Sequence, residues 1–141
     1  MSSTTPKTIA LNPGYRGFVV IVVHADYKQR VFLDVRDTEN TQITSATFEG
    51  QGAKAYAKNT FNNRLHWSFG PFDYQATISV KINHMEAGNR LVASKMYGPL
   101  EVDKQPEPDY PIKFCQSMVF SEDANDNDRD DCIVSVLQYL Q

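Results

Sequence analysis

An alternation of apolar and polar residues with a period of two runs through most of the chain and limits the folds that it can adopt. The segment 76–83, with the sequence ATISVKIN, places its isoleucines and valine on one face and its threonine, serine and lysine on the other. Side chains alternate in this way along a β-strand, whereas a helix repeats every 3.6 residues. The segment 29–35 (QRVFLDV) shows the same alternation, and the continuous apolar run 17–24 predicts a strand covered on both faces.

Turn signals that contain glycine or proline separate these segments from further strand candidates. The further candidates are 42–48, 64–69, 90–96, 112–120 and 132–140. The turn signals are NPG at 12–14, GQG at 50–52, GP at 70–71, GN at 88–89 and GP at 98–99. Their spacing of roughly ten residues is typical of a β-sandwich. Only 52–63 is a candidate helical turn, and it has no apolar stripe, so we predict an all-β protein.

One domain accounts for the chain, because 141 residues is near the commonest domain size. We expect a flexible tail over 1–7 and a single domain over 8–141. The proline-rich stretch 101–111 predicts an extended loop, since too little chain follows it for a second domain. The polar N-terminus lacks the charged and apolar parts of a signal peptide, so we expect a cytoplasmic or non-classically exported protein.

Charge and hydropathy argue against nucleic-acid and membrane partners. The net charge is only -3, and the Lys and Arg residues are scattered instead of clustered. No stretch approaches the roughly 20 apolar residues of a membrane helix, so we expect a soluble protein without membrane insertion. The two cysteines, Cys115 and Cys132, lie in apolar runs, either as buried free thiols or as one disulfide, and no Cys or His pair has zinc-ligand spacing.

The segment 121–131, with the sequence SEDANDNDRDD, carries six carboxylates between two apolar runs. Strands on either side would hold the ends of this loop together, and the like charges would repel by about 1 kcal/mol per pair even in water. A bound cation would remove this repulsion. Calcium is the best candidate because it takes six to eight oxygen ligands at flexible geometry, and no sulfur or imidazole lies nearby in the sequence.

Two other interpretations of this loop are an EF-hand and a solvated acidic turn. An EF-hand starting at Asp126 would need Gly at Asp131 and Glu at Leu137, so the loop is not an EF-hand. A solvated acidic turn without any ligand remains the alternative to a calcium site.

The loop resembles that of the two-calcium bacterial lectins that bind fucose and mannose, the fucose-binding lectin II family. The family's loop reads SEDGxDNDYND before an apolar final strand, and this chain has SEDANDNDRDD before CIVSVLQYLQ at 132–141. The distance from the last Asp to the C-terminus also agrees. Two further segments are similar, ATFEGQ at 46–51 to the family's ATFSGQ and ISVKIN at 78–83 to its Val-Ser-Val strand.

The resemblance implies an antiparallel β-sandwich of about nine strands, with two neighbouring calcium ions that sugar hydroxyls coordinate directly. The metal ligands that it implies are Glu122, Asp126, Asp128, Asp130, Asp131, Asp26 and the terminal carboxylate of Gln141 from a neighbouring subunit. The sugar-binding residues that it implies are Asp123, Asp126, Asp128, Asp131, Tyr27, Lys28 and Gln141. Asp128 and Asp131 would bridge the two ions. The expected partners are a fucose- or mannose-like sugar and a second copy of the chain, in a homodimer or a higher homo-oligomer.

The chain departs from the family's pattern at positions near the expected site. Asp26 and Asp130 stand where the family has Asn, which adds negative charge. Tyr27 and Lys28 stand where the family has small serines that help to select the sugar, so the sugar's identity is not inherited. Arg129 replaces an aromatic residue.

These features favour a calcium-dependent lectin over two other functions. A β-sandwich that keeps calcium as a structural staple but has lost sugar binding is the alternative, because Tyr27 and Lys28 are bulky. An enzyme is not expected, because carboxylates neutralised by calcium make poor general acids. His24, His66 and His84 are scattered and receive no role, and the aromatic cluster around Trp67 predicts core packing in preference to a sugar-stacking platform.

Overall fold

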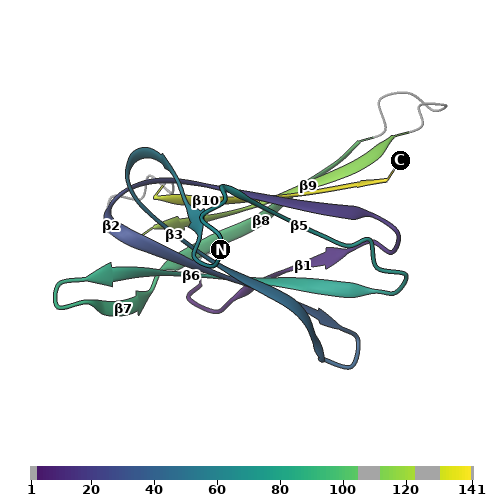
Figure 1. The fold of residues 1–141 in the computed structure, drawn as a ribbon, viewed down its shortest axis with the longest axis horizontal. Helices are drawn as coiled ribbons and strands as arrows, with labels where there is room; N and C mark the ends of the chain where they lie inside the picture. The colour runs from purple at the N-terminus through teal and green to yellow at the C-terminus, as the bar shows by residue number, and fades with distance from the viewer. Residues whose placement is uncertain (1–2, 105–111, 123–130, 141) are drawn as a thin grey trace.

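The computed structural model describes residues 3–104, 112–122 and 131–140. The described residues form ten β-strands. These are β1 Lys7–Leu11, β2 Arg16–Asp37, β3 Gln42–Tyr56, β4 Lys58–Asn59, β5 His66–Phe69, β6 Ala76–Glu86, β7 Arg90–Ala93, β8 Lys95–Lys104, β9 Lys113–Glu122 and β10 Cys132–Leu140. All the pairings are antiparallel, which confirms the predicted all-β antiparallel class (Figure 1). The described part of the chain contains no helix with the length and apolar character to cross a membrane.

The 22-residue strand β2 connects the two halves of the sheet. Its first half pairs with β10, and β9 and β8 follow in order beyond β10. Its second half pairs with β6, which in turn pairs with β1 and β7. The partner changes at a bulge, where Ala25 pairs with Gly52 and the next β3 pairing is Gln29 with Gly50. A bulge bends a strand and increases its twist, so this one lets a single strand belong to both layers.

The core lies between the two layers and is built from the inward-facing residues of the alternating strands. Its largest fully buried aromatic residue is Phe48, and the valines, isoleucines and leucines of β2, β6 and β10 surround it. The segment 17–24 was expected to be covered on both faces, and this is wrong. Val19, Ile21 and Val23 are buried, but Val22 is exposed and Phe18 and Val20 are half-buried, because no described element covers the outer face of this half of the sheet.

Two of the expected turns are irregularities inside long strands. Gly50–Gly52 lies within β3 opposite the β2 bulge, and Gly98–Pro99 lies within β8 where its register with β9 shifts. Gly52 has φ 109° and Gly98 has φ 108°, a backbone conformation that glycine adopts without a Cβ clash. Glycine in a strand interior often marks such a bulge, so these glycines mark irregularities within strands and not turns between them. No helix forms over 52–63, since β3 and β4 occupy 52–56 and 58–59, and only a single turn follows, in which the Asn63 backbone N–H donates to the Asn59 carbonyl oxygen at 2.8 Å.

Two further predictions concern side chains and the N-terminus. Cys115 and Cys132 are both buried and form no disulfide with each other, so the disulfide alternative is not adopted. Trp67, Phe69 and Phe72 pack in a chain of ring contacts against the core, as predicted. Ser3 forms backbone hydrogen bonds with Met96 in both directions, at 3.0 and 2.8 Å. The division into a flexible tail and one domain stays a prediction.

Candidate functional site

A pair of buried carboxylates marks the end of the sheet at which β9 stops and β10 starts. Cys132 pairs with Ser121, so the next position of the same register places Asp131 opposite Glu122. Directly opposed residues of an antiparallel ladder project to the same face with their Cβ atoms about 5 Å apart. Glu122 is only 3% exposed and Asp131 only 6%. Both acidic residues are therefore buried at the base of the acidic loop, at positions that an extension of the β9–β10 register places opposite each other.

The same row continues across the neighbouring strands. Lys95 of β8 pairs with Glu122, and on the other side the backbone N–H of His24 in β2 donates to the carbonyl oxygen of Asp131 at 2.9 Å. The register thus fixes Asp131 directly beside the first residues of the β2 bulge. The acid pair and the bulge, 107 positions apart between His24 and Asp131, belong to one site.

The donor set of the pair is consistent with a hard cation. Buried charges in proteins are paired or coordinate metals, and calcium binds carboxylate oxygens in preference to other donors. Among the described residues, no group of three or more His, Cys, Asp and Glu side chains is arranged to hold a metal. Two predicted ligands are thus brought together, and further ligands would have to come from the rest of the predicted set. Asp123, Asp126, Asp128, Asp130 and Gln141 of that set lie outside the described residues.

Three further predicted site residues, Asp26, Tyr27 and Lys28, lie on the β2 bulge and are all exposed. Asp26 contributes its backbone carbonyl to a 2.6 Å hydrogen bond from the Gln51 side-chain amide, which ties the bulge to β3. Asp26 lies two residues beyond His24, so it is at the same end of the sheet as Asp131. The structure therefore brings the bulge residues Asp26–Lys28 to the same end as Glu122 and Asp131, although they are distant in sequence.

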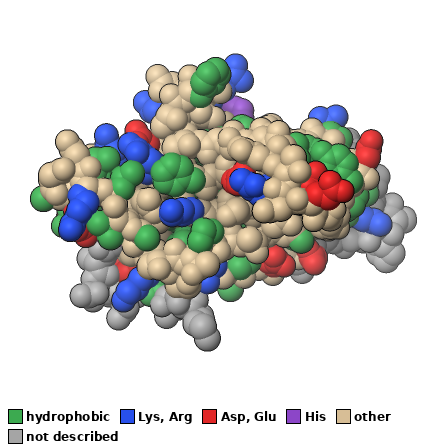
Figure 2. Space-filling model, turned by 90° about the horizontal axis from the view of Figure 1, so that it is seen from below, with side chains coloured by type: hydrophobic (Ala, Val, Ile, Leu, Met, Phe, Trp, Pro, Cys, Tyr) green, Lys and Arg blue, Asp and Glu red, His purple; other side chains and the backbone are tan. Residues whose placement is uncertain are grey.

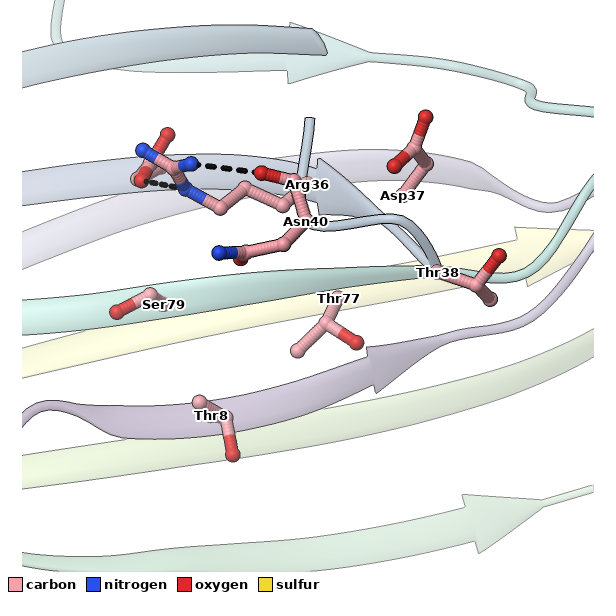
Figure 3. Close-up of a pocket in the computed structure, with 8 residues that line it drawn as sticks. Thr8, Arg36, Asp37, Thr38, Asn40, Thr77 and Ser79 are labelled. Carbon is pink, nitrogen blue, oxygen red and sulfur yellow. Dashed lines mark hydrogen bonds and ion pairs between the residues drawn. The ribbon is translucent and has the colours of Figure 1, made fainter. Parts of the chain in front are cut away.

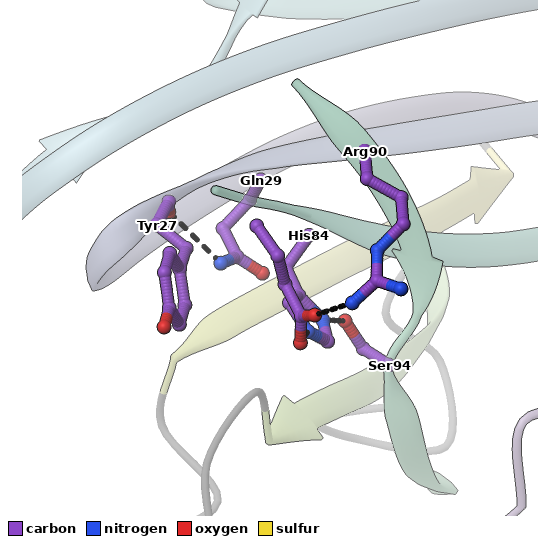
Figure 4. Close-up of polar contacts among 6 residues, drawn as sticks. Tyr27, Gln29, His84, Arg90 and Ser94 are labelled. Atoms are coloured by element: carbon purple, nitrogen blue, oxygen red, sulfur yellow. Dashed lines mark hydrogen bonds and ion pairs between the residues drawn. The ribbon is translucent and has the colours of Figure 1, made fainter. Parts of the chain in front are cut away.

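A polar network centred on the buried His84 lies beside the bulge, and the sequence reasoning missed it (Figure 4). His84 of β6 is 5% exposed, and its Nδ1 and Nε2 atoms lie 2.8 Å from Ser94 Oγ and 3.0 Å from Glu86 Oε2. The Arg90 guanidinium donates to the other carboxylate oxygen of Glu86 at 2.7 Å. The hydrogen bonds from His84 and then from Arg90 lower the pKa of Glu86. A signal was available, because residues two apart on a strand share a face, which places His84 beside Glu86.

His84 of this network and the neighbouring Gln29 hold Tyr27 in place. The Tyr27 and His84 rings have centroids 5.7 Å apart at an interplanar angle of 30°. Gln29, which is fully buried, donates its side-chain amide to the Tyr27 carbonyl oxygen at 3.0 Å. Above this support, Asp26, Tyr27, Lys28 and the β6–β7 turn enclose an open pocket of ≈ 400 Å³.

A second groove of ≈ 490 Å³ lies on the outer face of β1, β2 and β6, toward the opposite end of β6 (Figure 3). Its hydroxyl groups come from Thr8, Thr38, Thr77 and Ser79. Arg36 donates to Asp34 at 2.7 Å and to the Asn40 carbonyl at 2.9 Å. No predicted site residue lines this groove, and Figure 2 shows charged side chains of both signs scattered over one face of the molecule instead of gathered in one patch.

Comparison with known proteins identifies the class that this fold and site define. The model of the fucose-binding lectin II (PA-IIL) family matches residues 9–140. The chain belongs to this lectin family, as its acidic loop indicated. No curated protein matches the sequence significantly.

Solved structures of bacterial lectins are similar to the chain over almost its whole length. The C-terminal domain of the BC2L-C lectin from Burkholderia cenocepacia is 23% identical with a TM-score of 0.60, and the match covers 98% of this chain and 97% of that one. The Ralstonia solanacearum high-affinity mannose-binding lectin is 19% identical with a TM-score of 0.52, covering 92% and 93%. At these identities the likeness supports the fold, a β-sandwich of the lectin type.

Proposed function

We propose that the protein is a calcium-dependent lectin that binds a monosaccharide or glycan and releases it unchanged. The observation that carries this proposal is the buried Glu122–Asp131 pair, held by the sheet register in a chain of the fucose-binding lectin II family. Two acidic residues fixed in buried positions at the base of the loop favour a bound cation, because a cation would neutralise their charge.

Glu122 and Asp131 would supply the ligands that the sheet itself positions. Asp126, Asp128 and Asp130 of the loop, Asp26 of the bulge and the carboxylate of Gln141 would complete the sites for two ions. Bound there, calcium would supply coordination positions that neighbouring sugar hydroxyls fill. Carboxylates such as Asp123 and Asp126 would accept hydrogen bonds from the same sugar, and charge-assisted bonds of this kind are the stronger ones.

The expected ligand is a fucose- or mannose-like sugar. The family's description names fucose, and the Ralstonia solanacearum protein is described as mannose-binding. Both names support the class of ligand, whereas the exposed Tyr27 and Lys28 at the bulge make the choice of sugar particular to this chain.

A homodimer formed through the outer face of β2, β10, β9 and β8 would fit the chemistry of that face. Its ladder rows are Val22–Ile133–Phe120–Tyr97, Val20–Ser135–Met118–Leu100 and Phe18–Leu137–Gln116–Val102. All these residues except Ser135 and Gln116 are hydrophobic, and none is buried in the single chain. A contiguous apolar face of this size is unusual for a monomer and marks an interaction surface.

The same face supports a contribution of the partner's C-terminus to the site. The row that holds Glu122 and Asp131 borders the apolar face at one end, and β10 finishes at Leu140 at the other end. Two copies packed antiparallel across the face would bring the end of one β10 toward the acid pair of the other. The Gln141 carboxylate of one copy would then reach the metal site of the other copy, whereas within one chain the end of β10 and that site are at opposite ends of the face.

A glycan array probed with the native protein, in millimolar calcium and again in EDTA, tests the proposal. We expect binding to fucose- or mannose-terminated glycans in calcium and its loss in EDTA. A melting temperature that rises with calcium while no glycan binds would instead favour the calcium-stapled domain without sugar binding. If calcium changes neither the melting temperature nor glycan binding, both the lectin and the calcium-stapled domain lose their support.

A further inference from the structure

The pocket between the β2 bulge and the β6–β7 turn has the chemistry of a sugar subsite. Its lining residues are Asp26, Tyr27, Lys28, Gln51, Met85, Glu86, Ala87, Gly88 and Asn89. Its volume of ≈ 400 Å³ falls within the range of about 300–1,000 Å³ that is usual for small-molecule sites. The lining combines one aromatic ring with carboxylates, an ammonium group and amides. A pyranose needs this combination, since it has an apolar C–H face and a rim of hydroxyls.

Tyr27 is held as a fixed wall of this pocket. Its ring contacts the buried His84 ring at a tilt of 30°, and Ser94 and Glu86 anchor the His84 ring through both of its nitrogens. Its backbone carbonyl accepts from the buried Gln29 amide. The residue is nevertheless 42% exposed, so the ring keeps a free surface for a ligand. A preorganised aromatic surface costs little conformational entropy on binding, which makes it an efficient contact.

The network also joins the pocket to the acid pair. Ser94, which contacts His84, precedes Lys95, and Lys95 pairs with Glu122. On the other side, His24 bonds to Asp131 and stands two residues before Asp26. Two separate strand connections therefore link the pocket to the carboxylates that we propose hold the first sugar, and they place the pocket next to those carboxylates. This adjacency is what a second subsite for a linked residue requires.

We propose that this pocket binds the second residue of a glycan whose terminal fucose or mannose is held at the acidic loop, with Tyr27 as its stacking surface and His84 as a positioning residue. The inference rests on the proposed function and extends it from a monosaccharide to an oligosaccharide. Tyr27 gives the apolar contact, while Glu86, Lys28 and Asn89 are placed to accept from or donate to hydroxyls.

The test compares dissociation constants in calcium for methyl α-fucoside and methyl α-mannoside with those for a panel of disaccharides that carry fucose or mannose at the non-reducing end. We expect at least one disaccharide to bind five times more tightly than the matching methyl glycoside. Tyr27→Ala should reduce this ratio below two, and Tyr27→Phe should preserve it. Phe61→Ala is the matched control, because Phe61 is a 95% exposed aromatic residue outside the pocket lining.

The role of His84 is tested by a double-mutant cycle, which a purely structural role would not satisfy. His84→Ala should lower the disaccharide ratio, but adding it to Tyr27→Ala should lower the ratio no further, because His84 acts through Tyr27. Additive losses would overturn the positioning role.

The possible failures are distinguishable. If no glycoside of either length binds in calcium, the proposed function fails and the subsite fails with it. If the methyl glycosides bind but no disaccharide binds more tightly, or the gain survives Tyr27→Ala, only the subsite is overturned.

Discussion

Replacing Asp131 by Asn should change the stability of the protein in opposite directions with and without calcium. The substitution keeps the size of the side chain and leaves the backbone bond from His24 to Asp131 intact, so its main effect is the loss of one charge. Two unit negative charges at the spacing of opposed Cβ atoms, about 5 Å, repel by about 3 kcal/mol at an effective dielectric constant of about 20. Rearrangement of the two side chains would relieve part of this repulsion. We therefore expect Asp131→Asn to stabilise the metal-free protein by about 1–3 kcal/mol.

In calcium, Asp131→Asn should instead lower the stability of the protein relative to the wild type. A ligand bound only by the native state adds RT ln(1 + [L]/Kd), which is about 2.7 kcal/mol at a hundredfold excess over Kd. The variant loses a ligand that is proposed to bridge both ions, so most of this gain should disappear. For a chain of this length, 1 kcal/mol corresponds to a few degrees of melting temperature.

Thermal melts in EDTA and in millimolar calcium measure both effects. The matched control is Asp73→Asn, an exposed aspartate before β6, at the other end of that strand from the acid pair, which should change neither melt by more than about 0.5 kcal/mol. An Asp131→Asn protein that melts below the wild type in EDTA, and gains as much from calcium as the wild type does, would refute the reasoning.

Four further predictions address the site and the dimer. Asp128→Ala should remove most of the calcium-dependent rise in melting temperature, whereas Arg129→Ala should leave it nearly intact. Residues appended after Gln141 should sharply reduce sugar binding measured by calorimetry, because they convert the terminal carboxylate into a neutral carbonyl, while an N-terminal tag should not. Val22→Lys on the apolar face should give a monomer by light scattering, whereas Tyr74→Lys, at an exposed hydrophobic residue outside that face, should not; a wild-type monomer would contradict the dimer. Burial, and then the neighbouring Asp103, raise the pKa of the Cys115 thiol to about 11 from the ordinary 9.0. The unfolded chain therefore loses this proton first, and the contribution of Cys115 to stability should fall as pH rises from 9 to 11. Fast alkylation of native Cys115 at pH 8 would contradict the shift.

The sequence by itself located most of the strands, although not β1, β4 or the second half of β8, and it indicated which residues could bind a cation. Period-two alternation is a local property that each strand carries in its own residues, so 132–140 was identified with the bounds of β10. The density of carboxylates in 122–131 is equally local; it predicted a calcium site and, through resemblance, identified the family.

Only the tertiary structure decided which strands pair and what each pairing brings together. The glycines at 50–52 and 98–99 have the same local signature in a turn as in a bulge, and the long-range ladders of β2, β3, β8 and β9 determine which one forms. The burial of Glu122 beside Asp131 also follows from register and not from composition. The support of Tyr27 by His84 and Ser94 depends on contacts across β2, β6 and the start of β8 that no short stretch of sequence specifies, because pairing energy depends on partners that the chain meets only when it is folded.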